Sequence, residues 1–262
     1  MVTPSSPTSS AIAWDRDDVS VPAPEPWGRK GAFTTIRVEG IPPCPFFLNA
    51  HLDRLEKSAG LLEIVPIVSK SQISERLVTF LSSIQIPTPF LVRVCLLENC
   101  LALHTRPAHP TNPELSAKIL RHLRPVPEAK STFDKALYGR LGELDLGLED
   151  FLLVHPTEDR VLESATSNLI FARGEHLVIP EEDVLSGIVL NKLLLASMTG
   201  FEIDRRSPHL DELSAFEEII LCGSGREVAS LAAIPEMGWT CSSGKTFLKL
   251  LEIYNKLKAE YD

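Results

Sequence analysis

The spacing of apolar residues changes along this chain, and the changes separate expected strands from expected helices. Residues 31–40, "GAFTTIRVEG", alternate apolar and polar positions before a turn, which predicts a strand and then a hairpin. The following "CPFFLN" is expected to be the returning strand. Residues 90–105, "FLVRVCLLENCLALHT", predict two more strands that turn at Glu98 and Asn99.

Two segments between these strands have helical spacing instead. In residues 50–64 the apolar positions recur at spacings of 3 and 4, as on one face of a helix. These positions are Leu52, Leu55, Ala59 and Leu62. Residues 69–84 predict a second helix, for which Ser69 or Ser71 is the candidate N-cap.

The second half of the chain predicts more strands than helices. It follows a stretch rich in Pro and Asn at 106–116, which we interpret as a linker. The expected elements are a strand at 117–123, a helix at 131–144, short strands between 150 and 179, a helix at 188–200 closed by Gly200, a strand at 217–223 and a terminal helix at 245–261.

This order of elements predicts an α+β fold of two domains with a cleft between them. Residues 1–25 are rich in Pro, Ser and Asp and are expected to be a disordered tail. Residues 26–106 form the expected small N-terminal α/β domain, and 107–124 the linker and first strand. Residues 125–262 form the expected larger, β-rich C-terminal domain.

Charge and composition exclude several classes of function. A net charge of −9 over 262 residues argues against nucleic-acid binding, which depends on neutralising phosphates. No apolar run reaches the about 20 residues of a membrane span. The N-terminus lacks the features of a secretory signal, and the five cysteines form no C-x-x-C pair. We therefore expect a cytoplasmic protein without nucleic-acid or membrane partners.

Common catalytic motifs are also absent. The seven histidines are scattered, so the sequence predicts no metal site. "SSGKT" at 242–246 lacks the glycine spacing of a phosphate loop and is better explained as the N-cap of the last helix. No G-x-S-x-G is present, so a hydrolase nucleophile elbow has no support.

Two glycine-containing turns are candidate anion sites. In "CGSGREV", residues 222–228, the backbone around Ser224 and Gly225 follows a strand and either binds an anion or forms a plain turn. In "LSGIVLNKLL" a helix starts after Gly187, so the N–H groups of Ile188 and Val189 can face an anion or simply end a helix. Two such sites in one domain suggest a cofactor that carries a phosphate.

Two basic residues are further candidates. Arg54 lies beside the apolar stripe of the first helix, where it is either a solvated charge or a guanidinium that grips a phosphate. Lys130 follows a strand in "RPVPEAK" and is either a surface charge or an amine nucleophile. Lys135 is the rival lysine, but it falls inside an expected helix.

The segment "VLESATSNLIF", residues 161–171, predicts two strands around a kink, yet it contains three polar residues among apolar neighbours. These are Glu163, Ser167 and Asn168. Buried polar groups need partners, so each of these side chains requires an explanation.

The motifs together resemble the class IV aminotransferase family, whose members are pyridoxal 5′-phosphate (PLP) enzymes of fold type IV. The family includes branched-chain aminotransferases, D-amino-acid transaminases and aminodeoxychorismate lyases. The resemblance covers most of residues 28–235. It appears, in order, as "GAFTTIRV", "HLDRLEKSA", "RPVPEAK", "LESATSNLIF", "LSGI" and "GSGREV".

The resemblance implies a role for each candidate residue. Lys130 would form the Schiff base with the cofactor and move protons, and Glu163 would face the pyridine nitrogen. Ser167 and Asn168 would order the surroundings of the cofactor. The phosphate would be held by Arg54, Ile188, Val189, Ser224 and Gly225. Family members act on small amino substrates and are typically homodimers, so we expect both here.

Several positions depart from the family pattern and leave the reaction open. The Glu that often follows Phe in "GxFE" is Thr34 here, and where some members have a tyrosine this chain has Lys135, with Tyr138 nearby. The loop typical of many lyases is replaced by "VRVCLLENC". Both transamination and 4-amino-4-deoxychorismate lyase activity, which yields 4-aminobenzoate and pyruvate, remain candidates. A non-catalytic relative that uses the fold as a scaffold is the alternative.

Two expectations complete the site. Arg37 and Arg93 lie on expected strands and either bind the substrate carboxylate or pair with nearby acids. Without its cofactor Glu163 is expected to be a buried carboxylate that lacks a cation, so PLP is expected to stabilise the fold.

Overall fold

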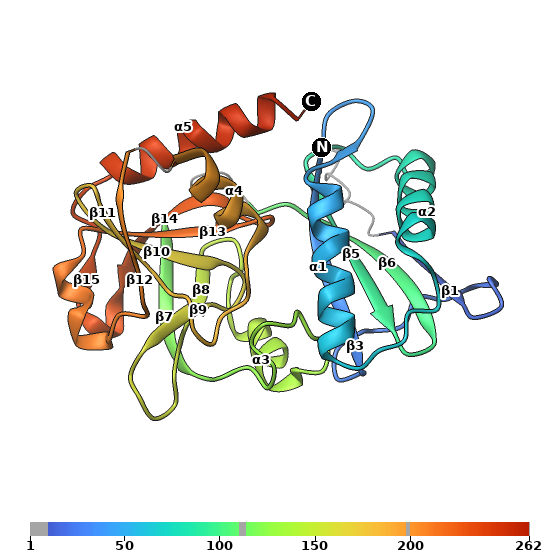
Figure 1. The fold of residues 1–262 in the computed structure, drawn as a ribbon, viewed down its shortest axis with the longest axis horizontal. Coiled ribbons are helices and arrows are strands. Elements are labelled where there is room, and N and C mark those ends of the chain that lie inside the picture. The colour runs from blue at the N-terminus through green and yellow to red at the C-terminus, as the bar shows by residue number, and fades with distance from the viewer. Residues whose placement is uncertain (1–9, 110–113, 198–199, 262) are drawn as a thin grey trace, which may run out of the picture. The chain divides into compact units, whose positions relative to one another are not determined.

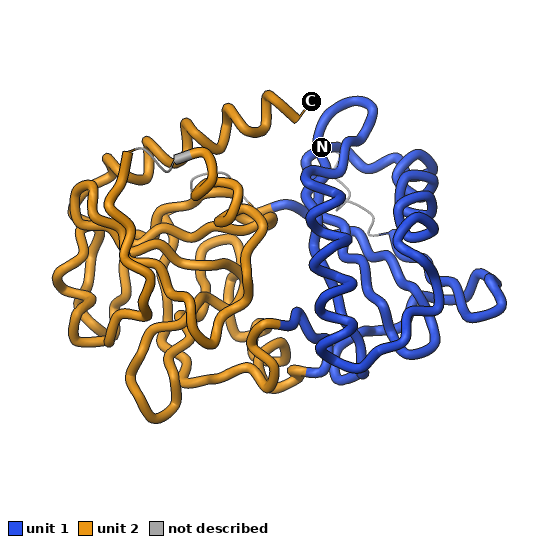
Figure 2. Tube along the Cα trace, in the orientation of Figure 1, with its two compact units in different colours: residues 1–108, 129–133 blue, residues 109–128, 134–262 orange. Residues whose placement is uncertain are grey.

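The computed structural model describes residues 10–109, 114–197 and 200–261 (Figure 1). The chain forms two compact units (Figure 2). Unit 1 consists of residues 1–108 and 129–133, and unit 2 of residues 109–128 and 134–262. The segment that contains Lys130 therefore groups with unit 1, whereas the sequence analysis assigned it to the C-terminal domain.

Unit 1 is a six-stranded antiparallel sheet with two helices. The strand order is β2-β1-β6-β5-β3-β4. The strands are β1 (Ala11–Asp15), β2 (Ser20–Val21), β3 (Gly31–Glu39), β4 (Cys44–Pro45), β5 (Phe90–Leu97) and β6 (Cys100–Pro107), and the helices are α1 (Leu48–Leu61) and α2 (Lys70–Ser83).

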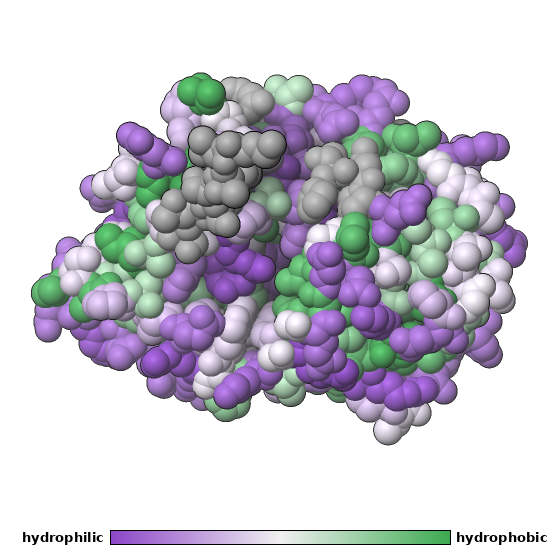
Figure 3. Space-filling model, turned by 180° about the vertical axis from the view of Figure 1, so that it is seen from behind, coloured by the Kyte–Doolittle hydropathy of each residue, from purple (hydrophilic) through white to green (hydrophobic). Residues whose placement is uncertain are grey.

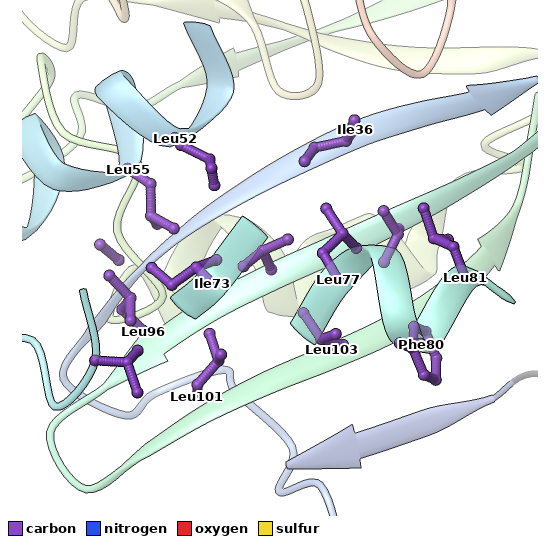
Figure 4. Close-up of a cluster of buried hydrophobic side chains, with 14 of the residues drawn as sticks. Ile36, Leu52, Leu55, Ile73, Leu77, Phe80, Leu81, Leu96, Leu101 and Leu103 are labelled. Carbon is purple, nitrogen blue, oxygen red and sulfur yellow. The ribbon is translucent and has the colours of Figure 1, made fainter. Parts of the chain in front are cut away.

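The core of unit 1 lies between the two helices and one face of the sheet. The helical spacing predicted from the sequence is confirmed, since Leu52 and Leu55 of α1 are buried. Ile73 and Leu77 of α2 point toward the strands in the same cluster (Figure 4). Burial of these side chains is what fixes both helices to the sheet.

The start of α2 follows one of the two predicted N-caps. Ser69 accepts a hydrogen bond from the Gln72 backbone N–H, and the Gln72 side chain accepts one from the Ser69 backbone N–H. This reciprocal pair is a capping box, which satisfies two backbone donors at the helix end. Ser69 is therefore the N-cap, and Ser71 lies inside the helix.

The structure differs from the expected elements at two places in unit 1. Residues 11–15 of the expected disordered tail form β1, which pairs along its whole length with β6. In the expected return strand "CPFFLN" only Cys44–Pro45 pairs with β3. The Phe46 N–H still donates to the Arg37 carbonyl of β3, but Phe47 has a positive φ of 53° and α1 starts at Leu48. Both phenylalanines are buried.

Unit 2 is built on a nine-stranded mixed sheet. Its order is β12-β11-β10-β13-β14-β7-β8-β9, and β15 also pairs with β14. The strands are β7 (Leu115–Arg121), β8 (Glu149–Val154), β9 (Val161–Ser164), β10 (Asn168–Arg173), β11 (His176–Ile179), β12 (Glu202–Arg205), β13 (Glu218–Gly223), β14 (Glu227–Ile234) and β15 (Trp239–Thr240). Among its helices are α3 (Lys135–Arg140), α4 (Ile188–Ser197), α5 (Lys245–Ala259) and the 3-10 turns η1 (Leu141–Glu143), η2 (Leu210–Ala215) and η3 (Pro235–Met237).

The helix expected at 131–144 is shorter than predicted. Residues 131–133 belong to unit 1, where the backbone of Thr132 donates to Gly31 and accepts from Gly28. The side chain of Asp134 then accepts a hydrogen bond from the Leu137 N–H and caps α3. Pairing with β3 therefore replaces the first turn of the expected helix.

The terminal helix begins within the segment that the sequence predicted as its N-cap. Gly244 is the N-cap of α5 and supplies no side-chain bond. The two oxygens of Glu218 instead accept hydrogen bonds from the N–H groups of Thr246 and Phe247, at 2.9 and 2.8 Å. Glu218 lies on β13 and is 1% exposed, so a carboxylate distant in sequence neutralises this helix terminus.

Three general properties follow from the described residues. No helix among them is long and apolar enough to cross a membrane. Hydrophobic and hydrophilic residues are interspersed on the face of the molecule in Figure 3. All five cysteines are free thiols.

We predict that Glu218→Ala lowers the free energy of unfolding by about 2 kcal/mol, because two helix N–H donors lose a buried charged acceptor. Urea denaturation measures this change. Glu217→Ala is the matched control, since Glu217 is the exposed neighbour, and should cost less than about 0.5 kcal/mol. Equal losses for the two variants would contradict the capping role of Glu218.

Candidate active site

Lys130 is held by its backbone between a strand and a helix of unit 1. Its N–H donates to the Ser58 hydroxyl of α1 at 3.1 Å, and its carbonyl accepts from the Phe33 N–H of β3 at 2.9 Å. Ser58 is fully buried, so this anchor is shielded from water. The backbone of Lys130 is therefore fixed, and this limits the positions that its side-chain amine can reach.

The Lys130 ammonium lies over an aromatic ring. Its Nζ is 4.9 Å from the centroid of Phe33, and the rings of Phe33 and Trp27 meet edge to face at 5.2 Å. Arg93 packs on the same aromatic pair, with its guanidinium carbon 4.3 Å from the Trp27 centroid. Ring faces attract cations, so the two aromatic residues orient both basic side chains.

Arg54 lies in a polar cluster of the same unit. Its Nη2 donates to the hydroxyl of Thr34 at 3.1 Å, and that hydroxyl lies 2.7 Å from Nδ1 of His51. Burial lowers the pKa of His51 well below its usual range, and the charges of Arg54 and Lys130 lower it further. The ring is therefore neutral at pH 7, and the Thr34 hydroxyl accepts from Arg54 while it forms a second hydrogen bond with the ring.

The sequence analysis did not identify His51. It stands three residues before Arg54 on α1, a spacing that places both side chains on one face of the helix. The three-residue spacing of His51 and Arg54 is visible in "HLDRLEKSA". It was not used because the histidines of the chain are scattered and form no motif. Thr34, noted only as a departure from the family, is the residue that joins His51 to Arg54.

Glu163 of β9 lies in the interior of unit 2 beside a cation. Nε of Arg124 is 2.9 Å from its Oε1, and both side chains are almost completely buried. The expectation that Glu163 lacks a cation without a cofactor is therefore wrong. A buried carboxylate needs a nearby positive charge, and the chain itself supplies one.

Tyr138 completes this group. Its hydroxyl accepts a hydrogen bond from Nη1 of Arg124 at 2.8 Å. Burial raises the pKa of Tyr138, so the phenol is neutral. The Glu163 charge raises the pKa of Arg124 despite the burial of the guanidinium. Arg124 was missed because an arginine in "HLRPVPEAK" carries no motif signal.

The kink in "VLESATSNLIF" is a tight turn between β9 and β10. The Ser167 N–H donates to the Ser164 hydroxyl at 2.8 Å, and the Ser164 N–H donates to the Ser167 carbonyl at 2.8 Å. The buried Ser167 hydroxyl has no hydrogen-bond partner among the described residues. A Cβ at Gly223 would lie 3.1 Å from this hydroxyl, so the glycine leaves room for it.

Asn168 connects this turn with the start of α4. Its side-chain amide donates to the Leu185 carbonyl at 2.7 Å. A Cβ at Gly187 would lie only 1.7 Å from Oδ1 of Asn168, so no other residue fits there without a rearrangement. Ile188 and Val189 are the first two residues of α4, and both are buried.

Ser224 and Gly225 form the turn between β13 and β14. Both are partly buried, and Gly223 and Glu227 pair across the base of the turn. Cys222 at the end of β13 pairs with Asn168 at the start of β10. Three segments of unit 2 are thus brought together by pairing and packing: the 164–168 turn, the 185–189 segment and the 223–227 turn.

The remaining candidates are placed as follows. Arg37 forms an ion pair with Glu39, which supports the structural interpretation of that arginine. Lys135 is the first residue of α3. Among the described residues, no group of three His, Cys, Asp or Glu side chains is arranged to hold a metal ion.

We predict that Arg124→Met lowers the free energy of unfolding by about 3–5 kcal/mol, because it leaves Glu163 buried without its cation. Chemical denaturation measures this loss. The double variant Arg124→Met/Glu163→Leu removes both charges and should recover most of it. If the double variant is as unstable as the single one, the ion pair is not the reason for the loss.

The sequence and the fold both match known proteins. The sequence model of the family "Amino-transferase class IV" matches residues 31–234. A search of curated proteins finds no match. Among solved structures, the branched-chain aminotransferase of Thermoproteus uzoniensis with norvaline has a TM-score of 0.78 at 20% identity, over 94% of this chain and 93% of that chain.

Two further structures have the same fold. The branched-chain amino acid aminotransferase of Thermobaculum terrenum in its PLP form has a TM-score of 0.76 at 18% identity, over 96% of this chain and 94% of that chain. A hypothetical aminotransferase from Mycobacterium tuberculosis in its PLP-bound form has a TM-score of 0.72 at 18% identity, over 94% of this chain and 98% of that chain. The family match spans most of both units, and the chain belongs to the class IV amino-transferase family.

Proposed function

We propose that this protein is a PLP-dependent enzyme in which Lys130 carries the cofactor and acts on a small substrate with an amino group. Family membership supports the enzyme class and its cofactor. The observation that carries the proposal for this chain is the buried Glu163–Arg124 pair next to the 164–168 turn. A scaffold protein gains no stability from burying such a charge pair in place of apolar residues.

The residues of unit 2 fit a phosphate-bearing cofactor. The Ser167 hydroxyl is buried without a partner among the described residues, and a ligand oxygen would supply one. Gly187 and Gly223 leave room for the side chains of Asn168 and Ser167, which the resemblance assigns to the surroundings of the cofactor. The N–H groups of Ile188 and Val189 lie in the first turn of α4, where an anion is favoured. We therefore assign Ile188 and Val189, with Ser224 and Gly225, to phosphate binding.

PLP supplies an electron sink for the negative charge that develops on the substrate carbon. Glu163 would favour a protonated pyridine nitrogen, which strengthens this sink. Arg124 places a positive charge 2.9 Å from Oε1 of Glu163 and so orients the carboxylate. Tyr138 fixes the opposite side of Arg124.

In unit 1, Lys130 would hold the cofactor covalently and then take and return the proton at the substrate carbon. The bonds from its backbone to Ser58 and Phe33 restrict the arc through which its amine moves. Arg54 would bind phosphate, with Thr34 and neutral His51 fixing its guanidinium. These polar contacts keep the guanidinium in one orientation before any anion arrives.

Two reactions remain in the proposal. Amino transfer is supported by the family match and its description. Release of 4-aminobenzoate and pyruvate from 4-amino-4-deoxychorismate is supported by Thr34, since "GAFTT" resembles some aminodeoxychorismate lyases. We also propose a homodimer in a cytoplasmic setting.

We predict that the purified protein binds PLP with a visible absorption band, and that borohydride then fixes the cofactor on Lys130. Peptide mass spectrometry identifies the modified lysine. Lys130→Ala should lose both the band and the adduct, whereas Lys135→Ala should keep them. A protein that stays colourless with added PLP would support the non-catalytic alternative. An adduct retained in Lys130→Ala would show that another residue carries the cofactor.

We further expect PLP-loaded protein to catalyse one of two reactions, and the same preparation can be tested for both. Amino transfer should require a keto acid and give the matching amino acid. Lyase activity should release pyruvate from 4-amino-4-deoxychorismate without a keto acid. Thr34→Ser, which keeps the hydroxyl, should retain activity, while Thr34→Val should lower it by freeing Arg54 from its support. Equal activity of these two variants would contradict the role of the Thr34 hydroxyl in supporting Arg54.

A further inference from the structure

A further carboxylate is buried in unit 2, next to the turn that contains Ser167. Asp150 is on β8, and its side chain is 1% exposed. Burial raises the pKa of Asp150, and the Arg226 charge and two hydroxyl donors oppose that shift. A buried carboxylate requires several hydrogen-bond donors or a cation. The groups that contact Asp150 are therefore the segments that it can hold in place.

Two of the donors come from the 164–168 turn. The hydroxyls of Ser164 and Thr166 donate to Oδ2 of Asp150, at 2.9 and 2.5 Å. The Ser164 hydroxyl also accepts the backbone N–H of Ser167. Asp150 thus fixes the Ser164 hydroxyl, which in turn fixes the backbone of Ser167. The Ser167 hydroxyl itself is buried without a partner among the described residues.

The 223–227 turn contributes a cation to Asp150 through an ion pair. Nε of Arg226 is 3.5 Å from Oδ2 of Asp150, and the arginine side chain is 2% exposed. Its Nη2 donates to the carbonyls of Leu146 and Glu149, at 2.9 and 2.7 Å. Arg226 therefore fastens the segment that contains Ser224 and Gly225 to the start of β8.

We infer that Asp150 is a positioning residue that holds the 164–168 turn and the 223–227 turn in register, so that both face the same phosphate group. One oxygen, Oδ2, serves both turns. If either turn moves, the Asp150 carboxylate moves with it and disturbs the other turn. This inference rests on the proposed function, because it concerns the phosphate of the proposed cofactor.

The phosphate can be tested apart from the rest of the cofactor, since pyridoxal lacks it. Asp150→Asn should weaken PLP binding about 10–100-fold, the usual cost of losing a residue that orients a binding group. Pyridoxal binding should change less than about threefold. Absorbance titration of both compounds gives the preference for PLP, defined as the Kd of pyridoxal divided by the Kd of PLP. A general loss of stability would leave this preference unchanged.

Two comparisons separate positioning from stability. Glu218→Gln is the matched control, because Glu218 is equally buried but lies at the other end of β13. It should lower stability and leave the preference for PLP as in the wild type. Thr166→Val removes one donor to Asp150 and should lower the preference, whereas Thr166→Ser keeps the donor and should not. The Thr166 pair also serves if Asp150→Asn fails to fold.

Amide hydrogen exchange without cofactor tests the connection between the turns directly. Asp150→Asn should speed exchange at both 164–168 and 223–227, and Glu218→Gln at neither. Faster exchange at 164–168 alone, or an unchanged preference for PLP, would overturn the inference. If the wild type binds no PLP while exchange still rises in both turns, the connection stands and the proposed function fails.

Discussion

A carboxylate removed from water is stable only beside a cation or several hydrogen-bond donors, and several carboxylates of unit 2 are almost completely buried. Glu163 is beside Arg124, Asp150 accepts from two hydroxyls next to Arg226, and Glu218 accepts from the first turn of α5. In each case the partner is remote in sequence or belongs to another element. These contacts therefore position the surrounding turns and helix as well as neutralising charge.

Four buried polar residues of unit 2 lie in one short stretch, at positions 163, 164, 167 and 168. They belong to β9, the 164–168 turn and the start of β10, and three of them are directed to different neighbours. Glu163 points to Arg124, Ser164 to Asp150, and Asn168 to the carbonyl before α4. A stretch that looks too polar for a strand is the place where four segments of unit 2 meet.

Much of this could be predicted from the sequence, because the relevant signals are local. Spacing placed α1 and α2, and the capping pattern included Ser69. The family motifs pointed to Lys130 and Glu163. Arg124, Asp150 and Arg226 were not found, because a buried partner for a carboxylate is chosen by tertiary packing and leaves no periodic trace. Glu218 shows the same limit, since the sequence placed the N-cap of α5 within 242–245 but did not predict the remote carboxylate that accepts from its first turn.

Unit 1 is discontinuous in the chain, since residues 129–133 return to it after 20 residues that belong to unit 2. During synthesis the first 108 residues can therefore form β1 to β6 and both helices, but the strand-like segment with Lys130 has not yet left the ribosome. Until then the Phe33 N–H and the Ser58 hydroxyl lack the hydrogen bonds that they form with the backbone of Lys130. The segment with Lys130, the proposed nucleophile, is the last part of unit 1 to be added, so a chain that stops at the end of β6 would lack it.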